Sequence, residues 1–281
     1  MSAHFLFLVM KISDVIKIVK SELAKEKITE ESETLWLISE TLNVKFGEVK
    51  MLGEIGEEDY KKIIANLQKR KKHMPLDYIV GKSEFFGLTF KVNQNCLIPR
   101  PETELLVEEV LKVARPWHKI VDIGTGSGAI AISVKKNINA KVVAVDISSA
   151  ALAVAKENAK NNATDIEFLQ SDLYSALKGQ KFDIIISNPP YIRSKDIAGL
   201  DSDVCDYEPH LALDGGESGL DFYKRLTREM DTYLNVDGYA FFEVGYDQAQ
   251  QVKSMFSDNY EVEIIKDYAK IQRIIKARRT K

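Results

Sequence analysis

One stretch limits the fold of this chain more than any other: residues 183–187, an acid followed by three isoleucines and a serine, after which Asn188 leads into two consecutive prolines. Because proline cannot donate a hydrogen bond to a neighbouring strand, the run predicts a buried β-strand that ends before Pro189 and Pro190. Asn188 and Tyr191 flank the two prolines. Ligands of open α/β sheets bind at the carboxyl ends of the strands. The stretch therefore predicts a site that recognises a planar, amide-like group.

Further strand-like runs surround this one, and helix-like segments separate most of them. The predicted strands occupy residues 120–123, 141–145, 166–169, 183–187, 239–244, 260–265 and 271–276. The last two lie close enough in the sequence to form an antiparallel pair. This alternation predicts an α/β fold with a doubly wound, mostly parallel, seven-stranded sheet of the Rossmann-like kind.

A glycine-rich loop follows the first predicted strand and precedes a helix. It consists of Gly124, Thr125, Gly126, Ser127 and Gly128. Glycines at alternate positions let the backbone approach a ligand where a Cβ atom would collide. The spacing differs from the GxGxxG of dinucleotide-binding loops, and the lysine of a triphosphate-binding P-loop is absent from the motif. We predict that these five residues bind an adenosyl cofactor.

Acidic residues end the next two predicted strands. Asp146 lies about twenty residues after the glycines, where a carboxylate accepts hydrogen bonds from both ribose hydroxyls. The alternative role is capping of the next helix, because Ser148 also precedes that helix. After the third strand, Asp172 is predicted to accept a hydrogen bond from the adenine amine, and Leu173 to supply a backbone N–H or an apolar wall.

The N-terminal part of the chain carries helical rather than strand-like patterns. Apolar residues recur at helical spacing over residues 12–23, 35–42 and 60–67. Residues 29–33 are typical of a capped start for the second helix. So small a bundle more often binds a partner than performs chemistry, so we predict that residues 1–75 form a substrate-docking helical domain. The basic run at 69–73 fits either a solvated helix end or a contact patch for an acidic partner.

The next segment, residues 76–97, is predicted to be a β-hairpin linker. Its short strands are expected at residues 78–80 and 85–92, around Gly81 and Gly87. The remaining residues, 98–281, are predicted to form the catalytic domain.

Composition narrows the class of protein. A net charge of −3 gives no global electrostatic reason to bind nucleic acid. Two cysteines are too few for a disulfide scaffold and fit a reducing cytosol, and the four histidines lack the spacing of a metal site. The apolar run at residues 5–10 is too short to span a bilayer and lacks the basic segment of a signal peptide. We therefore expect a cytoplasmic protein without a metal or a membrane anchor, and the native start stays open between Met1 and Met10.

Several motifs together resemble one known family. They are IPRPETE at 98–104, DIGTGSGAIA at 122–131, Asp146, NPPY at 188–191, the linker, and residues 208–220. These resemble the PrmC/HemK family of class I S-adenosylmethionine-dependent methyltransferases, which modify the side-chain amide nitrogen (N5) of the glutamine in the GGQ motif of class 1 peptide chain release factors. The resemblance implies S-adenosylmethionine as cofactor, S-adenosylhomocysteine as product, a release factor as partner, a role in translation termination and a monomer. Leu173 departs from the pattern, since some members carry an aromatic residue there.

The resemblance also implies roles for the residues of the NPPY motif. The side-chain oxygen of Asn188 and the backbone carbonyl of Pro189 accept the two hydrogens of the substrate amide. Pro190 stiffens this segment, and Tyr191 packs against the substrate side chain. Hydrogen bonds that strengthen as the nitrogen loses its planarity stabilise the transition state selectively.

Two other functions are compatible with parts of this pattern. A DNA or RNA methyltransferase that acts on the exocyclic amine of adenine (N6) uses the same NPPY motif, but the chain offers little room for a separate target-recognition domain. A non-catalytic adenosyl-binding regulator would leave the NPPY residues without a task.

Overall fold

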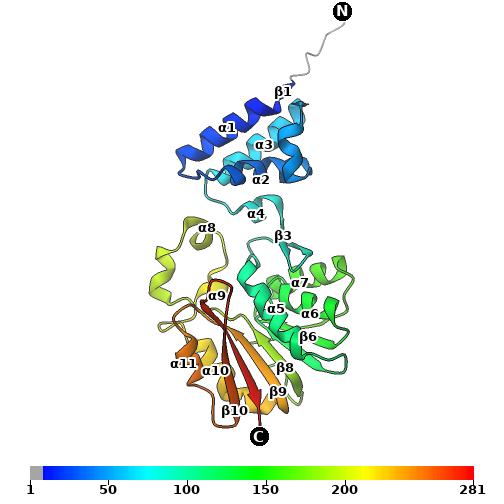
Figure 1. The fold of residues 1–281 in the computed structure, drawn as a ribbon, viewed down its shortest axis with the longest axis vertical. Helices are drawn as coiled ribbons and strands as arrows, with labels where there is room; N and C mark the ends of the chain where they lie inside the picture. Colours follow the sequence, from blue (N-terminus) through cyan, green and yellow to red (C-terminus); the bar gives the residue numbers. More distant parts are fainter. Residues whose placement is uncertain (1–8) are drawn as a thin grey trace, which may run out of the picture. The chain divides into compact units, whose positions relative to one another are not determined.

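The computed structural model describes residues 9–281, which divide into two compact units (Figure 1). The first unit contains the described residues up to Gly81 together with Ser202–Tyr207, and the second contains Lys82–Asp201 and Glu208–Lys281. Most of the apolar run at 5–10 lies outside the described residues. No helix within residues 9–281 has both the length and the apolar composition needed to cross a membrane.

The first unit is a helical bundle, and it includes residues 76–81 and 202–207, which lie beyond the predicted 1–75. Its main helices are α1 (Ile12–Lys25), α2 (Glu31–Leu42) and α3 (Glu57–Arg70), and its smaller elements are β1 (Met10–Lys11), η1 (Phe46–Met51), β2 (Glu54–Ile55), α4 (Leu76–Val80) and α8 (Ser202–Cys205). Val15, Leu37 and Ile63 are fully buried where the three main helices meet. The expected cap at residues 29–33 is wrong, because α2 begins after Glu30 and no side-chain hydrogen bond caps this end in the described chain.

The basic run at the end of α3 is only partly solvated. Lys69 and Lys72 are exposed, whereas Arg70 is buried and donates from Nε to Oε1 of Glu33 at 2.6 Å. Tyr207 donates its hydroxyl to the carbonyl of Lys72 at 2.5 Å, which ties the segment 202–207 to this end of the helix. The arginine therefore braces the bundle, while the exposed lysines keep the solvated role.

One predicted strand of the linker is wrong. Residues 78–80 belong to the helix α4, which Pro75 precedes and which ends at Gly81 with a φ of 78°. A short apolar run suits a helix as well as a strand, and a left-handed glycine is a common helix terminator. The hairpin itself is present as β3 (Lys82–Phe85) and β4 (Leu88–Lys91). Its turn divides the predicted 85–92 strand at Phe86 and Gly87, both with positive φ.

The second unit is built on the predicted seven-stranded sheet. Its strands are β5 (Lys119–Ile123), β6 (Lys141–Asp146), β7 (Glu167–Gln170), β8 (Phe182–Ser187), β9 (Leu234–Glu243), β10 (Tyr260–Lys266) and β11 (Gln272–Arg279). Their order is β10-β11-β9-β8-β5-β6-β7, and only the two pairings of β11, with β10 and with β9, are antiparallel. The mostly parallel sheet is thereby confirmed.

Helices cover both faces of this sheet (Figure 1). One face packs against α5 (Pro101–Val113), α6 (Ala129–Asn137) and α7 (Ser149–Asn161), and the other against α10 (Asp221–Tyr233) and α11 (Ala249–Lys253). Successive strand residues alternate between the two cores: Val121 and Ile185 face α10, whereas Ile120 and Ile184 face α5 and α6. Because both faces are buried, the carboxyl ends of the strands remain as the place for a site.

Candidate active site

A cavity lies at the carboxyl ends of the parallel strands, within the second unit. Of the residues predicted to bind cofactor or substrate, its wall contains Gly124, Gly126, Asp146, Asp172, Leu173, Asn188, Pro189 and Pro190. The segments that follow β5, β6, β7 and β8 all contribute to it. The remaining predicted residues, Thr125, Ser127, Gly128 and Tyr191, lie outside this wall.

Asp146 is the acid at the end of β6, and it is 9% exposed. Its Oδ2 accepts from the backbone N–H of Gly126 at 2.8 Å, and its Oδ1 accepts from that of Ser148 at 2.9 Å. Ser148 itself caps α7, because its Oγ accepts from the backbone N–H of Ala151 at 3.1 Å. Burial raises the pKa of Asp146 above its usual value. Since a carboxylate has about four acceptor positions, both oxygens can still accept hydrogen bonds from the cavity.

The glycines of the loop have two different surroundings: some border the cavity, and one lies between helices. Gly124 and Gly126 have φ values of 76° and 56°, and no atom lies within 4 Å of the position that a Cβ would take at either glycine. At Gly128 a Cβ would lie 2.9 Å from Cδ1 of Ile132 and 3.1 Å from Cβ of Ala155. The first two glycines therefore open the cavity, and the third lets α6 pack against α7.

Thr125 and Ser127 hold the loop from behind. Thr125 donates from Oγ1 to Oδ2 of Asp122 at 2.6 Å, and the carbonyl of Ser127 accepts from Nδ2 of Asn158 at 2.9 Å. Asp122 is fully buried, and burial raises its pKa to about 7. The sequence showed Asp122 as a strand residue but gave no sign of this role beneath the glycine loop.

Asp172 and Leu173 form the wall after β7. Asp172 accepts from Nη2 of Arg225 at 2.8 Å, and both side chains are partly exposed. Leu173 is 8% exposed and adopts a left-handed φ of 48°, which is uncommon for a residue with a branched side chain. Arg225, on α10, also lines the cavity and was not predicted. Its contact with Asp172 spans 53 residues of sequence, so no local pattern marks it.

The NPPY segment leaves β8 and enters the same wall. Asn188 donates from Nδ2 to Oγ1 of Thr103 at 3.3 Å, which leaves its Oδ1 as the acceptor of the side chain. Pro189 and Pro190 line the cavity beside it. Tyr191 instead packs against the core on the α10 side, where burial raises its pKa to about 12 and keeps the phenol neutral.

The loop at residues 213–219 grips the backbone just after the NPPY motif. Ile192 donates its backbone N–H to the carbonyl of Leu213 at 3.1 Å and accepts from that of Gly215 at 2.8 Å. A Cβ on Gly215 would lie 2.8 Å from the carbonyl oxygen of Pro190 and 2.8 Å from Cα of Tyr191. This close approach requires glycine, so the loop fixes the exit of the motif.

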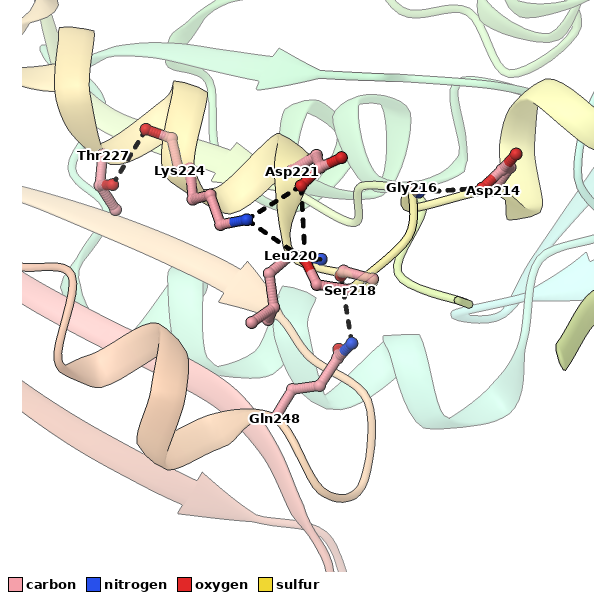
Figure 2. Close-up of polar contacts among 9 residues, drawn as sticks. Asp214, Gly216, Ser218, Leu220, Asp221, Lys224, Thr227 and Gln248 are labelled. Atoms are coloured by element: carbon pink, nitrogen blue, oxygen red, sulfur yellow. Dashed lines mark hydrogen bonds and ion pairs between the residues drawn. The ribbon is translucent and has the colours of Figure 1, made fainter. Parts of the chain in front are cut away.

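Gln248 fastens this loop from the opposite side. Its Nε2 donates to the carbonyls of Tyr191 at 2.9 Å and Gly219 at 3.1 Å, and its Oε1 accepts from the backbone N–H of Gly245 at 3.1 Å. Figure 2 shows its side chain reaching the loop that carries Ser218 and Leu220. Because Gln248 is 2% exposed, water does not compete with these bonds. No sequence pattern indicated a role for Gln248.

The contacts of Arg100 explain why a cationic residue lies between Pro99 and Pro101. Its Nη2 pairs with Oε1 of Glu208, whose side chain is 2% exposed, and its Nη1 donates to the carbonyl of Ile98 at 2.9 Å. The pair links the segment before α5 to the segment that supplies Pro209 and Leu211 to the cavity. Within residues 9–281 no group of three or more His, Cys, Asp or Glu side chains is arranged to hold a metal ion.

Comparison with known proteins identifies relatives of this chain. The family model of the methyltransferase small domain matches residues 101–202. A release factor glutamine methyltransferase from Geobacter sulfurreducens is 40% identical over 228 residues, which are 80% of this chain and 80% of that protein. One from Clostridium acetobutylicum is 42% identical over 233 residues, 80% of this chain and 82% of that protein.

Among solved structures, a methyltransferase from Pyrococcus furiosus matches with a TM-score of 0.54 at 21% identity, over 69% of this chain and 90% of that chain. This likeness supports the methyltransferase fold, and the sequence relatives define the family. The predicted resemblance is thus confirmed: the chain belongs to the family of release factor glutamine methyltransferases.

Proposed function

We propose that this enzyme transfers a methyl group from S-adenosylmethionine to the side-chain amide nitrogen of the glutamine in the GGQ motif of a class 1 peptide chain release factor. The family supports the reaction class and the substrate. The observation that carries the proposal is Asn188, which stands in the cavity wall with its amide nitrogen already bonded to Thr103. Its oxygen is therefore the group that meets a substrate amide.

The cavity fits the adenosyl part of this cofactor. The space in front of Gly124 and Gly126 is open and would be filled by any Cβ, and both carboxylate oxygens of Asp146 keep an acceptor position. We assign Asp146 to the ribose hydroxyls and Asp172 with Leu173 to the adenine. We assign Gly124 and Gly126 to direct contact with the cofactor, and Thr125, Ser127 and Gly128 to holding their loop in shape.

The substrate side of the site orients an amide nitrogen, which is a weak nucleophile because its lone pair is delocalised. S-adenosylmethionine supplies an electrophilic methyl group on a sulfonium. The Oδ1 of Asn188 and the carbonyl of Pro189 would accept the two N–H bonds of the substrate amide, and both acceptors gain strength as the nitrogen becomes more ammonium-like. Since the double proline and the Gly215 contact fix this segment, it needs little reorganisation. Asn188 also borders the cofactor side of the cavity.

No dedicated base needs to act before transfer. As the new N–C bond forms, the S–CH3 bond of the sulfonium would break and leave S-adenosylhomocysteine. The N-methylated amide still carries both N–H protons at that moment, is therefore cationic and strongly acidic, and loses one proton readily to solvent. Tyr191 lies outside the cavity wall, against the core, and its pKa of about 12 keeps it from serving as a base, so we propose that it meets the substrate side chain by packing alone. Orientation of this kind supplies on the order of 7–11 kcal/mol of barrier reduction in favourable systems.

We assign the docking of the release factor to the helical first unit. The cavity wall contains residues of the second unit, which leaves the first unit free of the chemistry. We further propose that the enzyme acts as a monomer in the cytoplasm, where its substrate works.

The first test follows labelled methyl groups. Purified enzyme is incubated with methyl-labelled S-adenosylmethionine and either release factor, DNA or ribosomal RNA. We expect label in the release factor. Label in nucleic acid and not in the release factor would overturn the proposal in favour of an exocyclic-amine methyltransferase.

A further inference from the structure

Glu243 is the last residue of β9, next to the strand that delivers Asn188. The two strands run parallel, and Phe242 lies opposite Ser187 in their register. Glu243 follows Phe242, and Asn188 follows Ser187, so the carboxyl and the amide lie at the ends of neighbouring strands. Glu243 is 4% exposed. A carboxyl group so deeply buried beside the site has no part in the chemistry described so far.

Thr103 stands at the same strand ends. It lies in the first turn of α5, is 4% exposed, and accepts from Nδ2 of Asn188 through Oγ1. A threonine hydroxyl that accepts from one side can donate its own proton on another. The carboxyl of Glu243 is the group beside Thr103 that can accept this hydrogen bond. Burial raises the pKa of Glu243 to about 7, and the neighbouring Thr103 hydroxyl and Asn188 amide lower it in part.

One oxygen of Glu243 keeps a free acceptor position. Its Oε2 is buried without a hydrogen-bond partner among residues 9–281, and Thr103 and Asn188 are the side chains that act on this carboxyl as hydrogen-bond donors. Burying a carboxyl in this way is unfavourable, and an apolar side chain would fill the space at lower free energy. Packing alone therefore does not account for a carboxyl at position 243. The hydrogen-bond donors of Asn188 and Thr103 do, because they need an acceptor there.

We propose that Thr103 and Glu243 are positioning residues that fix the orientation of the Asn188 amide, with Nδ2 toward Thr103 and Oδ1 toward the substrate nitrogen. The inference rests on the proposed function. The two ends of an asparagine amide have almost the same shape, so packing alone does not choose between them. A flipped amide would present N–H groups to the N–H groups of the substrate, and the acceptor needed for transfer would be lost.

The hydroxyl of Thr103 can be removed without changing the volume of the side chain. Thr103→Val deletes it, and Thr103→Ser keeps it. We expect Thr103→Val to lower kcat about 10- to 100-fold, as for the loss of one buried hydrogen bond, with the affinity for S-adenosylmethionine unchanged. Thr103→Ser should recover most of kcat. Thr227→Val is the matched control, because the Thr227 hydroxyl bonds within α10 to the carbonyl of Tyr223 at 2.8 Å.

The kinetic assays use full-length enzyme and intact release factor, and calorimetry gives the cofactor affinity. Thr103→Val with unchanged kcat would overturn the inference, and so would an equal loss in Thr103→Ser, since shape rather than the hydroxyl would then matter. Adding Thr103→Val to Asn188→Ala should cause no further loss, because Thr103 acts through Asn188. An additive loss would contradict it.

Glu243→Gln provides a second variant that keeps the volume and the acceptor but adds a competing N–H₂ group. We expect a smaller fall in kcat than for Thr103→Val, again with unchanged cofactor affinity. Full activity in Glu243→Gln would show that Glu243 does not position the Asn188 amide. If the wild-type enzyme does not methylate the release factor, the proposed function itself fails. Wild-type turnover with a fully active Thr103→Val enzyme defeats this inference alone.

Discussion

The carboxylate of Asp146 accepts a hydrogen bond from the backbone N–H of Gly126, with 2.8 Å between Oδ2 and N. The bond joins the end of β6 to the glycine loop after β5, although the two residues are 20 positions apart. One side chain therefore shapes the loop and also faces the cavity. The glycine loop and Asp146 therefore depend on each other and do not form two independent cofactor contacts.

Asp146→Ala should weaken cofactor binding strongly. It removes the bond to Gly126 that holds the glycine loop, the bond to Ser148 before α7, and the proposed acceptor of the ribose hydroxyls. Hydrogen bonds to a charged group contribute about 1.5–3 kcal/mol each, so we expect the Kd for S-adenosylmethionine to rise by about 100-fold or more. Calorimetric titration measures it, with the exposed Asp258→Ala as control. An unchanged Kd in Asp146→Ala would remove Asp146 from the site.

Gln248→Leu should destabilise the fold near the NPPY motif. The change leaves the carbonyls of Tyr191 and Gly219 and the N–H of Gly245 without their buried partner. Each unsatisfied buried group costs about 1–3 kcal/mol, so the free energy of unfolding in urea should fall by several kcal/mol.

The neighbouring Gln251→Leu is the control for this change, because Gln251 is exposed. It should leave the urea midpoint nearly unchanged. Equal midpoints for the two variants would mean that Gln248 does not fasten the loop.

Asp122 should make the stability depend on pH. Burial disfavours the charged form and raises the pKa of Asp122 from its ordinary 3.8 to about 7 in the folded protein. Between these values the folded protein keeps a proton that the unfolded chain has released, so its contribution is present below pH 3.8 and is lost as the pH rises through about 7.

Asp122→Asn removes this titration, and the free energy of unfolding should then fall less steeply between these pH values. Glu243, whose pKa is also raised to about 7, contributes a slope of the same sign that remains in the variant. Urea unfolding at a series of pH values measures both slopes. Identical slopes for wild type and Asp122→Asn would show that Asp122 ionises normally.

Deletion of residues 1–75 should separate docking from chemistry. If the helical unit binds the release factor, kcat/KM for intact release factor should fall far more than the affinity for S-adenosylmethionine. Transfer to a short peptide that contains the glutamine serves as the control and should change little. Equal kcat/KM on intact release factor before and after deletion would count against docking.

The strands and most helices could be predicted because their signals are local. Residues 183–187 and the prolines after them fixed both the strand and its end, and the positions of Gly124, Asp146 and Asn188 followed from their strands. The error at 78–80 arose where a three-residue apolar run suits two structures equally, and Pro75 with Gly81 decided for a helix.

The residues behind the site could not be predicted, because their partners are distant in sequence. Thr103 is 85 positions from Asn188, and Gln248 is 57 positions from Tyr191. Neither has an unusual local context: Thr103 reads as part of a helix start, and Gln248 as an ordinary polar residue. Only the folded sheet brings them to the NPPY segment, so no local sequence pattern marks either residue.

The central claim is that Asn188 holds a release-factor glutamine for methyl transfer. Mass spectrometric mapping of release factor, after incubation with S-adenosylmethionine and either wild-type enzyme or Asn188→Ala, tests it most directly. We predict one added methyl group on the side-chain amide of the GGQ glutamine with wild type. With Asn188→Ala we predict a loss in rate of about 100-fold or more, while the variant still binds the cofactor. A methyl group on another residue, or equal rates for the two enzymes, would contradict the account.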